Sequence, residues 1–178
     1  MGRIILVYGV IAGVTVALLM RVAMALFPEG GTGGMVAGFS SMIIALTFVF
    51  IGVKRYRDVE LGGVIHFGKA LAVGFGIAAI ATVLYVAAWE LYLYFTNYTF
   101  MDEYTRIALQ QAKEAGKSAG EIAALVKEMD GFKALYADPI SRMAVTAMEI
   151  SPVAILMPLI SAALLRNSRF MPAKAAIA

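Results

Sequence analysis

Three ionisable residues lie inside long apolar stretches of the sequence: Arg21, Glu90 and Glu149. A charged side chain at the centre of a membrane helix costs about 2.5–3.5 kcal/mol, so each is expected to face other helices or a water-filled cavity and to have a partner. One residue is cationic and two are anionic. The three could form a polar pocket that binds a cation, a proton or a lipid headgroup. The alternative is a buried ion pair that sets the register of the helices.

The spacing predicts that these residues lie at comparable depths. At the α-helical rise, Arg21 lies about 9 Å before the end of its stretch at Phe27, and Glu90 about 8 Å before Phe95. Glu149 lies about 14 Å inside the last stretch. Because successive membrane helices alternate in direction, all three fall in the same half of the bilayer. For Arg21, the alternative is that its long side chain extends to the membrane surface.

The elements that must position these residues are four apolar stretches. The chain has 178 residues, of which 61% are hydrophobic and 15% charged, and its mean hydropathy is +0.83. A soluble domain is usually about 45–50% apolar. A transmembrane helix needs roughly 17–25 residues, and residues 4–27, 35–53, 67–95 and 140–165 meet that length. We therefore expect residues 1–178 to form a single all-α integral membrane domain with four transmembrane helices.

A polar insert, residues 96–138, separates the third and fourth stretches. Its two capping-box sequences are Thr99-x-x-Asp102 and Ser118-x-x-Glu121. Such sequences are typical of helix starts, and Gly116 and Gly131 are placed to end helices. We therefore expect helices over residues 102–115 and 119–130 that pack as a hairpin. Asp138 is expected to cap the fourth transmembrane helix.

The basic residues gather at one end of the expected helices. They are Arg3, Lys54, Arg55, Arg57, Lys69, Arg166, Arg169 and Lys174. Since loops rich in Lys and Arg stay in the cytoplasm, both termini should be cytoplasmic and the helical hairpin extracytoplasmic. Four of these residues surround the second connection. Lys54, Arg55, Arg57 and Lys69 are expected to contact anionic lipid headgroups, each with about 1 kcal/mol.

Small residues at helix spacing predict close helix packing. Gly9-x-x-x-Gly13 and Gly34-x-x-x-Gly38 match the spacing of a common packing motif, and Gly76 lies on the same helix face as Glu90. Small side chains let two backbones approach each other. The contacts could join helices of one chain or helices of two copies.

Composition excludes several kinds of chemistry. The chain has no cysteine and a single histidine, His66, which excludes disulfides, thiolate sites and histidine-cluster metal sites. The sequence shows no nucleophile–base pair, no paired metal carboxylates and no dinucleotide motif. A net charge of +3 is too small to predict nucleic-acid binding. We expect no metal, no cofactor and no enzymatic activity.

These expectations lead to two functional hypotheses. The first is a non-enzymatic structural or partner-binding membrane component, whose partners are membrane lipids and either another membrane protein or a second copy. The alternative is a small oligomeric carrier or channel that uses Arg21, Glu90 and Glu149.

The second connection and its flanks resemble a known family. Residues 51–58 read IGVKRYRD and residues 61–70 read LGGVIHFGKA. A basic end of the second helix, a G-G turn and an F-G-K-A start of the third helix are similar to the bacterial membrane family known as domain of unknown function 4199. The layout of four spans with a long third connection resembles it too. The resemblance implies a multi-pass protein of the bacterial inner membrane and implies no biochemical activity.

Overall fold

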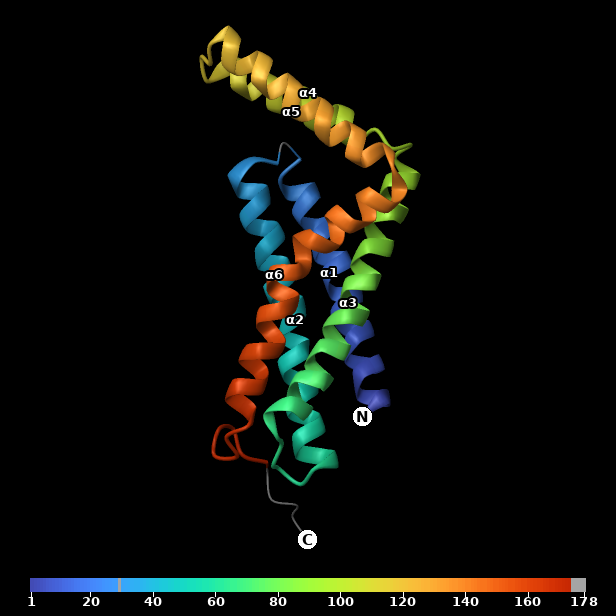
Figure 1. Cartoon of the computed structure of the whole chain (residues 1–178), viewed down its shortest axis with the longest axis vertical. Coiled ribbons are helices and arrows are strands. Elements are labelled where there is room, and N and C mark those ends of the chain that lie inside the picture. The colour runs from blue at the N-terminus through green and yellow to red at the C-terminus, as the bar shows by residue number, and fades with distance from the viewer. Residues whose placement is uncertain (29, 174–178) are drawn as a thin grey trace.

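The computed structural model describes residues 1–28 and 30–173, and over these ranges the regular secondary structure is entirely helical (Figure 1). The elements are α1 (Gly2–Leu26), α2 (Gly31–Arg55), the π-helical segment η1 (Tyr56–Glu60), α3 (Phe67–Phe95), α4 (Phe100–Glu114), α5 (Ala119–Ala137) and α6 (Pro139–Leu165). Four helices are long and apolar enough to cross a membrane: α1, α2 with η1, α3 and α6. This confirms the predicted all-α class and indicates a multi-pass membrane protein.

The four long helices lie side by side (Figure 1). Helices α1 and α6 each pack against α2 and α3, and fully buried residues such as Val49, Ile77 and Ile150 fill the centre. Large apolar side chains also cover the outside, for example Leu18, which is 63% exposed, and Val83, which is 67% exposed. Extended apolar surfaces of this kind mark contact with a membrane or another protein.

The second helix is longer at both ends than the predicted span 35–53. It begins at Gly31, where Gly30 and Gly31 have φ angles of 66° and 64°. These left-handed angles suit glycine and allow a tight turn from α1. At its other end the helix continues through the π-helical segment to Glu60. Lys54 and Arg57 therefore lie on helical turns and not in an extended loop.

Helices α4 and α5 form a hairpin that lies across one end of the long helices (Figure 1). Helix α5 packs against α4 and against α6. Lys133 of α5 and Asp102 of α4 form an ion pair of 2.8 Å, and Met129 and Ala112 are buried. The start of α1 and the end of α6 lie at the opposite end of the molecule.

Two predicted helix starts are confirmed. Ser118 and Glu121 form a complete capping box, in which each side chain accepts from the other residue's backbone N–H. Hydrogen bonds from the Ser118 side chain and backbone hold the pKa of the Glu121 carboxyl below its usual value. Asp138 caps α6 by accepting from the backbone N–H of Ser141 at 2.7 Å. Each of these contacts is local in sequence, which explains why the pattern alone predicted it.

Two other helix-end predictions are wrong. Thr99 has a helical backbone, and its hydroxyl donates to the carbonyl of Thr96 at 2.9 Å instead of capping α4. Gly131 does not end α5, which continues to Ala137. Glycine costs a helix about 1 kcal/mol. The ion pair of Lys133 and the packing of Tyr136 against the core stabilise the extra turns beyond it.

Candidate functional site

The three ionisable residues predicted from the sequence do not pair with one another. Glu90 instead pairs with Arg142 of α6. The guanidinium carbon of Arg21 lies 4.4 Å from the ring centre of Tyr92. Among the described residues, Arg21 forms no ion pair with Glu90 or Glu149. The predicted cluster is therefore three separate contacts. Glu90 pairs with Arg142, Glu149 accepts a hydrogen bond from Tyr85, and Arg21 lies against the ring of Tyr92.

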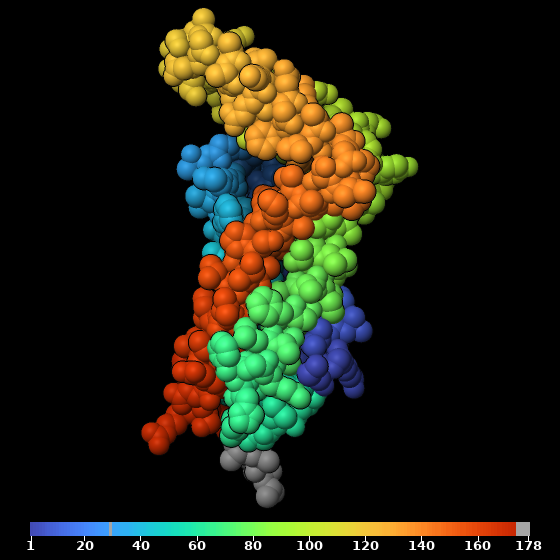
Figure 2. All heavy atoms as spheres, in the orientation of Figure 1, coloured from blue at the N-terminus to red at the C-terminus, as the bar shows by residue number. Residues whose placement is uncertain are grey.

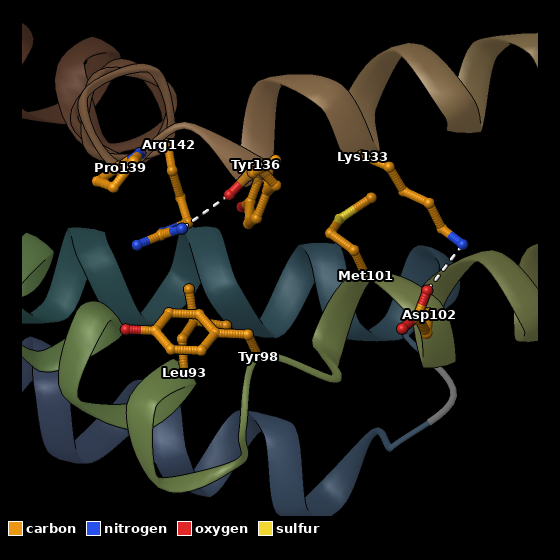
Figure 3. Close-up of a pocket in the computed structure, with 9 residues that line it drawn as sticks. Leu93, Tyr98, Met101, Asp102, Lys133, Tyr136, Pro139 and Arg142 are labelled. Carbon is orange, nitrogen blue, oxygen red and sulfur yellow. Dashed lines mark hydrogen bonds and ion pairs between the residues drawn. The ribbon is translucent and has the colours of Figure 1, made fainter.

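Arg142 joins three parts of the chain. Its Nε and Nη2 donate to the two carboxylate oxygens of Glu90 at 2.7 and 2.6 Å, and its Nη1 donates to the carbonyl of Tyr136 at 2.7 Å. The guanidinium also lies 5.0 Å from the ring centre of Tyr98. Figure 3 shows Arg142 between Tyr136 and this ring. With only 6% of its surface exposed, Arg142 is buried in a bidentate, charge-assisted contact, which is the strong kind.

The end of α3 is shaped to bring Tyr98 over Arg142. The backbone N–H of Tyr98 donates to the carbonyl of Leu93 at 2.8 Å, and Asn97 has a φ of 51°. This is the Schellman arrangement, in which a left-handed residue follows the last helical turn. Tyr98 itself has a φ of 57°, which costs a non-glycine residue about 1–3 kcal/mol. The contact of its ring with Arg142 helps to hold that conformation.

A cavity of about 420 Å³ lies at this junction of the hairpin with the long helices. It is lined by Leu93, Tyr98, Met101, Asp102, Lys133, Tyr136, Ala137, Pro139 and Arg142 (Figure 3). Each of its charged side chains already has a charged partner, Lys133 with Asp102 and Arg142 with Glu90. The cavity is therefore an aromatic and apolar space bordered by neutralised pairs.

Aromatic side chains continue the junction into α4 and α5. The ring of Trp89 lies 4.8 Å from that of Phe100 in an edge-to-face contact and 5.3 Å from that of Tyr92. Phe100 in turn lies 6.3 Å from Tyr136. Aromatic pairs at such distances contribute about 0.5–1.5 kcal/mol each beyond the area they bury. The hairpin is thus held to α3 and α6 by packing as well as by Arg142.

Glu149 has a different environment from Glu90. Its Oε2 accepts a hydrogen bond of 3.3 Å from the hydroxyl of Tyr85, which is 4% exposed. Glu149 as a whole is exposed. It forms no ion pair with any described residue, although α6 is one of the four helices that are long and apolar enough to cross a membrane.

Sequence reasoning missed Arg142 and the two tyrosines that surround it. One signal was present. Arg142 precedes Glu149 by seven residues, which places both on one side of a helix. The tyrosines had no comparable signal, because Tyr98 lies in a turn and Tyr136 contributes a backbone carbonyl, which any residue could supply.

The predicted lipid-headgroup contact of Arg57 requires correction. The Arg57 side chain is fully buried and pairs with Asp58 at 2.7 Å. Its guanidinium donates to the carbonyls of Leu165, Phe170 and Met171, at 3.4, 2.9 and 2.5 Å. The last carbonyls of a helix lack partners within the helix. Arg57 therefore satisfies the end of α6 and the segment after it, and it is not available to lipids.

The other basic residues of this region differ in exposure. Lys54 is partly buried and pairs with Asp58, whereas Arg55 and Lys69 are exposed. Lipid contact by these three residues stays a prediction. Lys174, predicted to contribute to the same basic surface, lies outside the described residues.

The predicted packing glycines fall into two groups. A Cβ atom at Gly9 or Gly13 would lie 2.6 Å from the Cβ of Ile80 or Leu84, so α1 meets α3 closely there. At Gly76 a Cβ would lie 3.0 Å from Ile5 of α1. Within the chain, Gly34 and Gly38 of α2 show no such close packing, and packing of these two glycines against a second copy stays a prediction. Gly38 has no atom within 4 Å of such a Cβ, and Gly34 meets only Phe27 at an ordinary 3.6 Å.

A protein-family model matches most of the chain. The model of the family described as "Protein of unknown function (DUF4199)" matches residues 7–167, which include most of α1, all of the other long helices and the complete hairpin. No curated protein and no solved structure matches the chain. Because the family model covers most of the sequence, the chain belongs to the DUF4199 family.

Proposed function

We propose that this protein is a non-enzymatic membrane component that presents the α4–α5 hairpin as a docking surface for another membrane protein. The observation that carries this proposal is the attachment of the hairpin. Its base is fixed to α3 and α6 through Arg142. Among the described helices, α5 packs substantially only against α4 and α6. A surface that is held firmly and left uncovered is suited to binding a partner.

The hairpin has apolar side chains on its outside. Tyr104, Val126, Phe132 and Leu135 are 48%, 38%, 40% and 45% exposed. These residues lie outside the four helices that are apolar enough to cross a membrane. Aromatic and aliphatic side chains form the centre of protein interfaces. Figure 2 also shows a hollow between the hairpin and the nearby end of α1 and α2, which a partner segment could enter.

The proposed setting is the cytoplasmic membrane of a bacterium, with both termini in the cytoplasm and the hairpin outside. Two observations support this orientation. The start of α1 and the end of α6 lie away from the hairpin (Figure 1). Arg3, Arg55, Lys69 and Arg166 are exposed at that same end of the helices, where basic residues favour the cytoplasm.

Site-specific photocrosslinking in native membranes tests the docking surface. A photoreactive amino acid replaces Phe132 or Leu135 on the hairpin, with Lys127 and the membrane-facing Val83 as control positions. We expect a discrete protein adduct from the hairpin positions that mass spectrometry identifies as one partner or as a second copy. A photoreactive residue at Tyr104 should give the same adduct. In that chain, the double substitution Phe132→Asp/Leu135→Asp should remove the adduct without lowering the amount of protein in the membrane.

The proposal fails if the hairpin positions crosslink only to lipid. It also fails if the double aspartate variant keeps the same adduct at the same yield.

A further inference from the structure

We propose that Glu149 binds an exchangeable proton within the membrane-spanning part of α6. This role is independent of docking by the hairpin. The two membrane-helix carboxylates differ in their hydrogen-bond donors, since one has a cationic donor and the other has a neutral donor. Glu90 receives two hydrogen bonds from the guanidinium of Arg142. Glu149 receives one hydrogen bond of 3.3 Å from the neutral hydroxyl of Tyr85. An isolated carboxylate taken out of water is so unfavourable that it becomes neutral instead, and a proton is the simplest means.

The cations near this region are already engaged. Arg142 is held by Glu90 and by the carbonyl of Tyr136. Arg21 of α1 lies against the ring of Tyr92. Neither forms an ion pair with Glu149 among the residues that the structure describes. The carboxyl group is therefore left to a proton and not to a basic side chain.

The other titratable groups around Glu149 are neutral phenols. Tyr85 faces it from α3, and Tyr136 at the end of α5 lies close enough to interact with it electrostatically. Helix α2 has no titratable side chain between residues 31 and 53. On α6 itself the neighbouring polar group is Thr146, whose hydroxyl donates to the carbonyl of Arg142. No described group competes with a proton for the negative charge.

The proton can exchange because the site is not sealed. Glu149 is exposed, and its hydrogen bond with Tyr85 is only partly buried. Pro152 lies three residues further along α6 and has no N–H to donate to the carbonyl of Met148. That carbonyl is adjacent to Glu149 in sequence and offers an acceptor to water. The exposed carboxyl group and this carbonyl together offer a path along which a proton can enter and leave.

Labelling with dicyclohexylcarbodiimide tests the proposal on the purified full chain in detergent. The reagent adds a protonated carboxyl across one of its C=N bonds, and the product rearranges to a stable acylurea that keeps all atoms of both reactants. Peptide mass spectrometry then measures labelling of each carboxylate across a pH series. We expect Glu149 to be labelled about tenfold more than Glu90, because a tenfold difference in the protonated fraction corresponds to one pH unit. Labelling of Glu149 should fall as the pH rises.

Glu90 is the matched control, because it is the same residue type in another membrane-spanning helix of the same molecule. Glu149→Gln should remove the label while keeping the elution and unfolding behaviour of the parent protein, since glutamine resembles the neutral acid. If that variant does not fold, the comparison of Glu149 with Glu90 in the unchanged protein still decides. Equal labelling of the two residues, or none at Glu149, would overturn the proposal. Protection by sodium at constant pH would also overturn it, because the occupant would then be a metal cation.

Discussion

Arg142 determines how the hairpin is attached, because one buried guanidinium contacts the side chain of Glu90, the backbone of Tyr136 and the ring of Tyr98. These partners come from α3, α5 and the turn between α3 and α4. Arg57 has a comparable role at the other end of the molecule, where it contacts the end of α6 and the segment after it. Both arginines matter for stability because their contacts are buried. If either arginine were removed, the polar groups that it contacts would lose their partner and could not be solvated by water instead.

Replacing Arg142 should destabilise the protein strongly. Arg142→Leu leaves Glu90, whose side chain is 19% exposed, without its partner. Breaking a buried ion pair costs about 3–5 kcal/mol, which thermal unfolding in detergent would detect. Arg142→Lys should recover only part of the loss, because an ammonium cannot make the bidentate contact. The double variant Glu90→Leu/Arg142→Leu should be more stable than Arg142→Leu. A single variant as stable as the parent would contradict the role given to this pair.

Arg57 and Arg55 offer a matched pair, because they are two residues apart and differ in burial. Arg57→Leu should lower the free energy of unfolding by about 3–5 kcal/mol, since it leaves Asp58 with Lys54 alone and removes the donor to the carbonyls of Leu165, Phe170 and Met171. Arg55→Leu should change it by less than about 0.5 kcal/mol. Limited proteolysis after Leu165 provides a second measurement, with faster cleavage expected in Arg57→Leu alone. Equal effects of the two variants would mean that Arg57 is not buried as described.

At the scale of elements, the contact of α1 with α3 is the closest of those involving the predicted glycines. Gly9 and Gly13 lie one turn apart on α1 and face Ile80 and Leu84 of α3. In a membrane, helix association depends on such van der Waals packing, because lipid tails are as apolar as the side chains. The same spacing on α2 faces open space at Gly38. Spacing alone therefore does not identify an interface.

Alanine substitutions should distinguish the two glycine motifs. At Gly13 the new Cβ would lie 2.6 Å from the Cβ of Leu84, so α1 and α3 must move apart at a cost of about 1–3 kcal/mol. At Gly38 no atom lies within 4 Å, and alanine should be neutral or stabilise the helix by up to about 1 kcal/mol. Thermal unfolding of both variants under identical detergent conditions checks this. A Gly38→Ala loss as large as that of Gly13→Ala would show that α2 packs against another molecule.

At the scale of the whole molecule, the fold separates two chemically different ends. The hairpin lies at one end, and most exposed basic residues outside the hairpin lie at the other, near the start of α1 and the end of α6 (Figure 1). If the four long helices cross a membrane, this separation places the hairpin and the basic surface in different compartments.

Single-cysteine labelling tests this orientation with no background, because the chain contains no cysteine. Lys117 and Ser168 are exposed, the first between α4 and α5 and the second after α6. A membrane-impermeant maleimide should label Lys117→Cys in intact spheroplasts and Ser168→Cys only after the membrane is permeabilised. The reverse result would place the hairpin in the cytoplasm, and labelling of both positions in intact spheroplasts would contradict four membrane crossings.

The sequence by itself determined the features that depend on neighbours along the chain. Apolar stretches of sufficient length predicted four long helices to within a few residues, because hydrophobicity and backbone hydrogen bonding within a helix are local. The caps at Ser118 and Asp138 were predictable for the same reason. The loop sequence around residues 51–70 was enough to indicate the family.

Only the tertiary structure decided which side chains meet across helices. Glu90 pairs with Arg142 instead of Arg21, Arg57 is buried instead of exposed to lipid, and Gly13 packs where Gly38 does not. These outcomes depend on the rotation and crossing of each helix, which the packing of all four sets jointly. A change of one residue in register turns a side chain by about 100°. Depth in the membrane can therefore be predicted from one stretch, whereas the partner of a charge cannot.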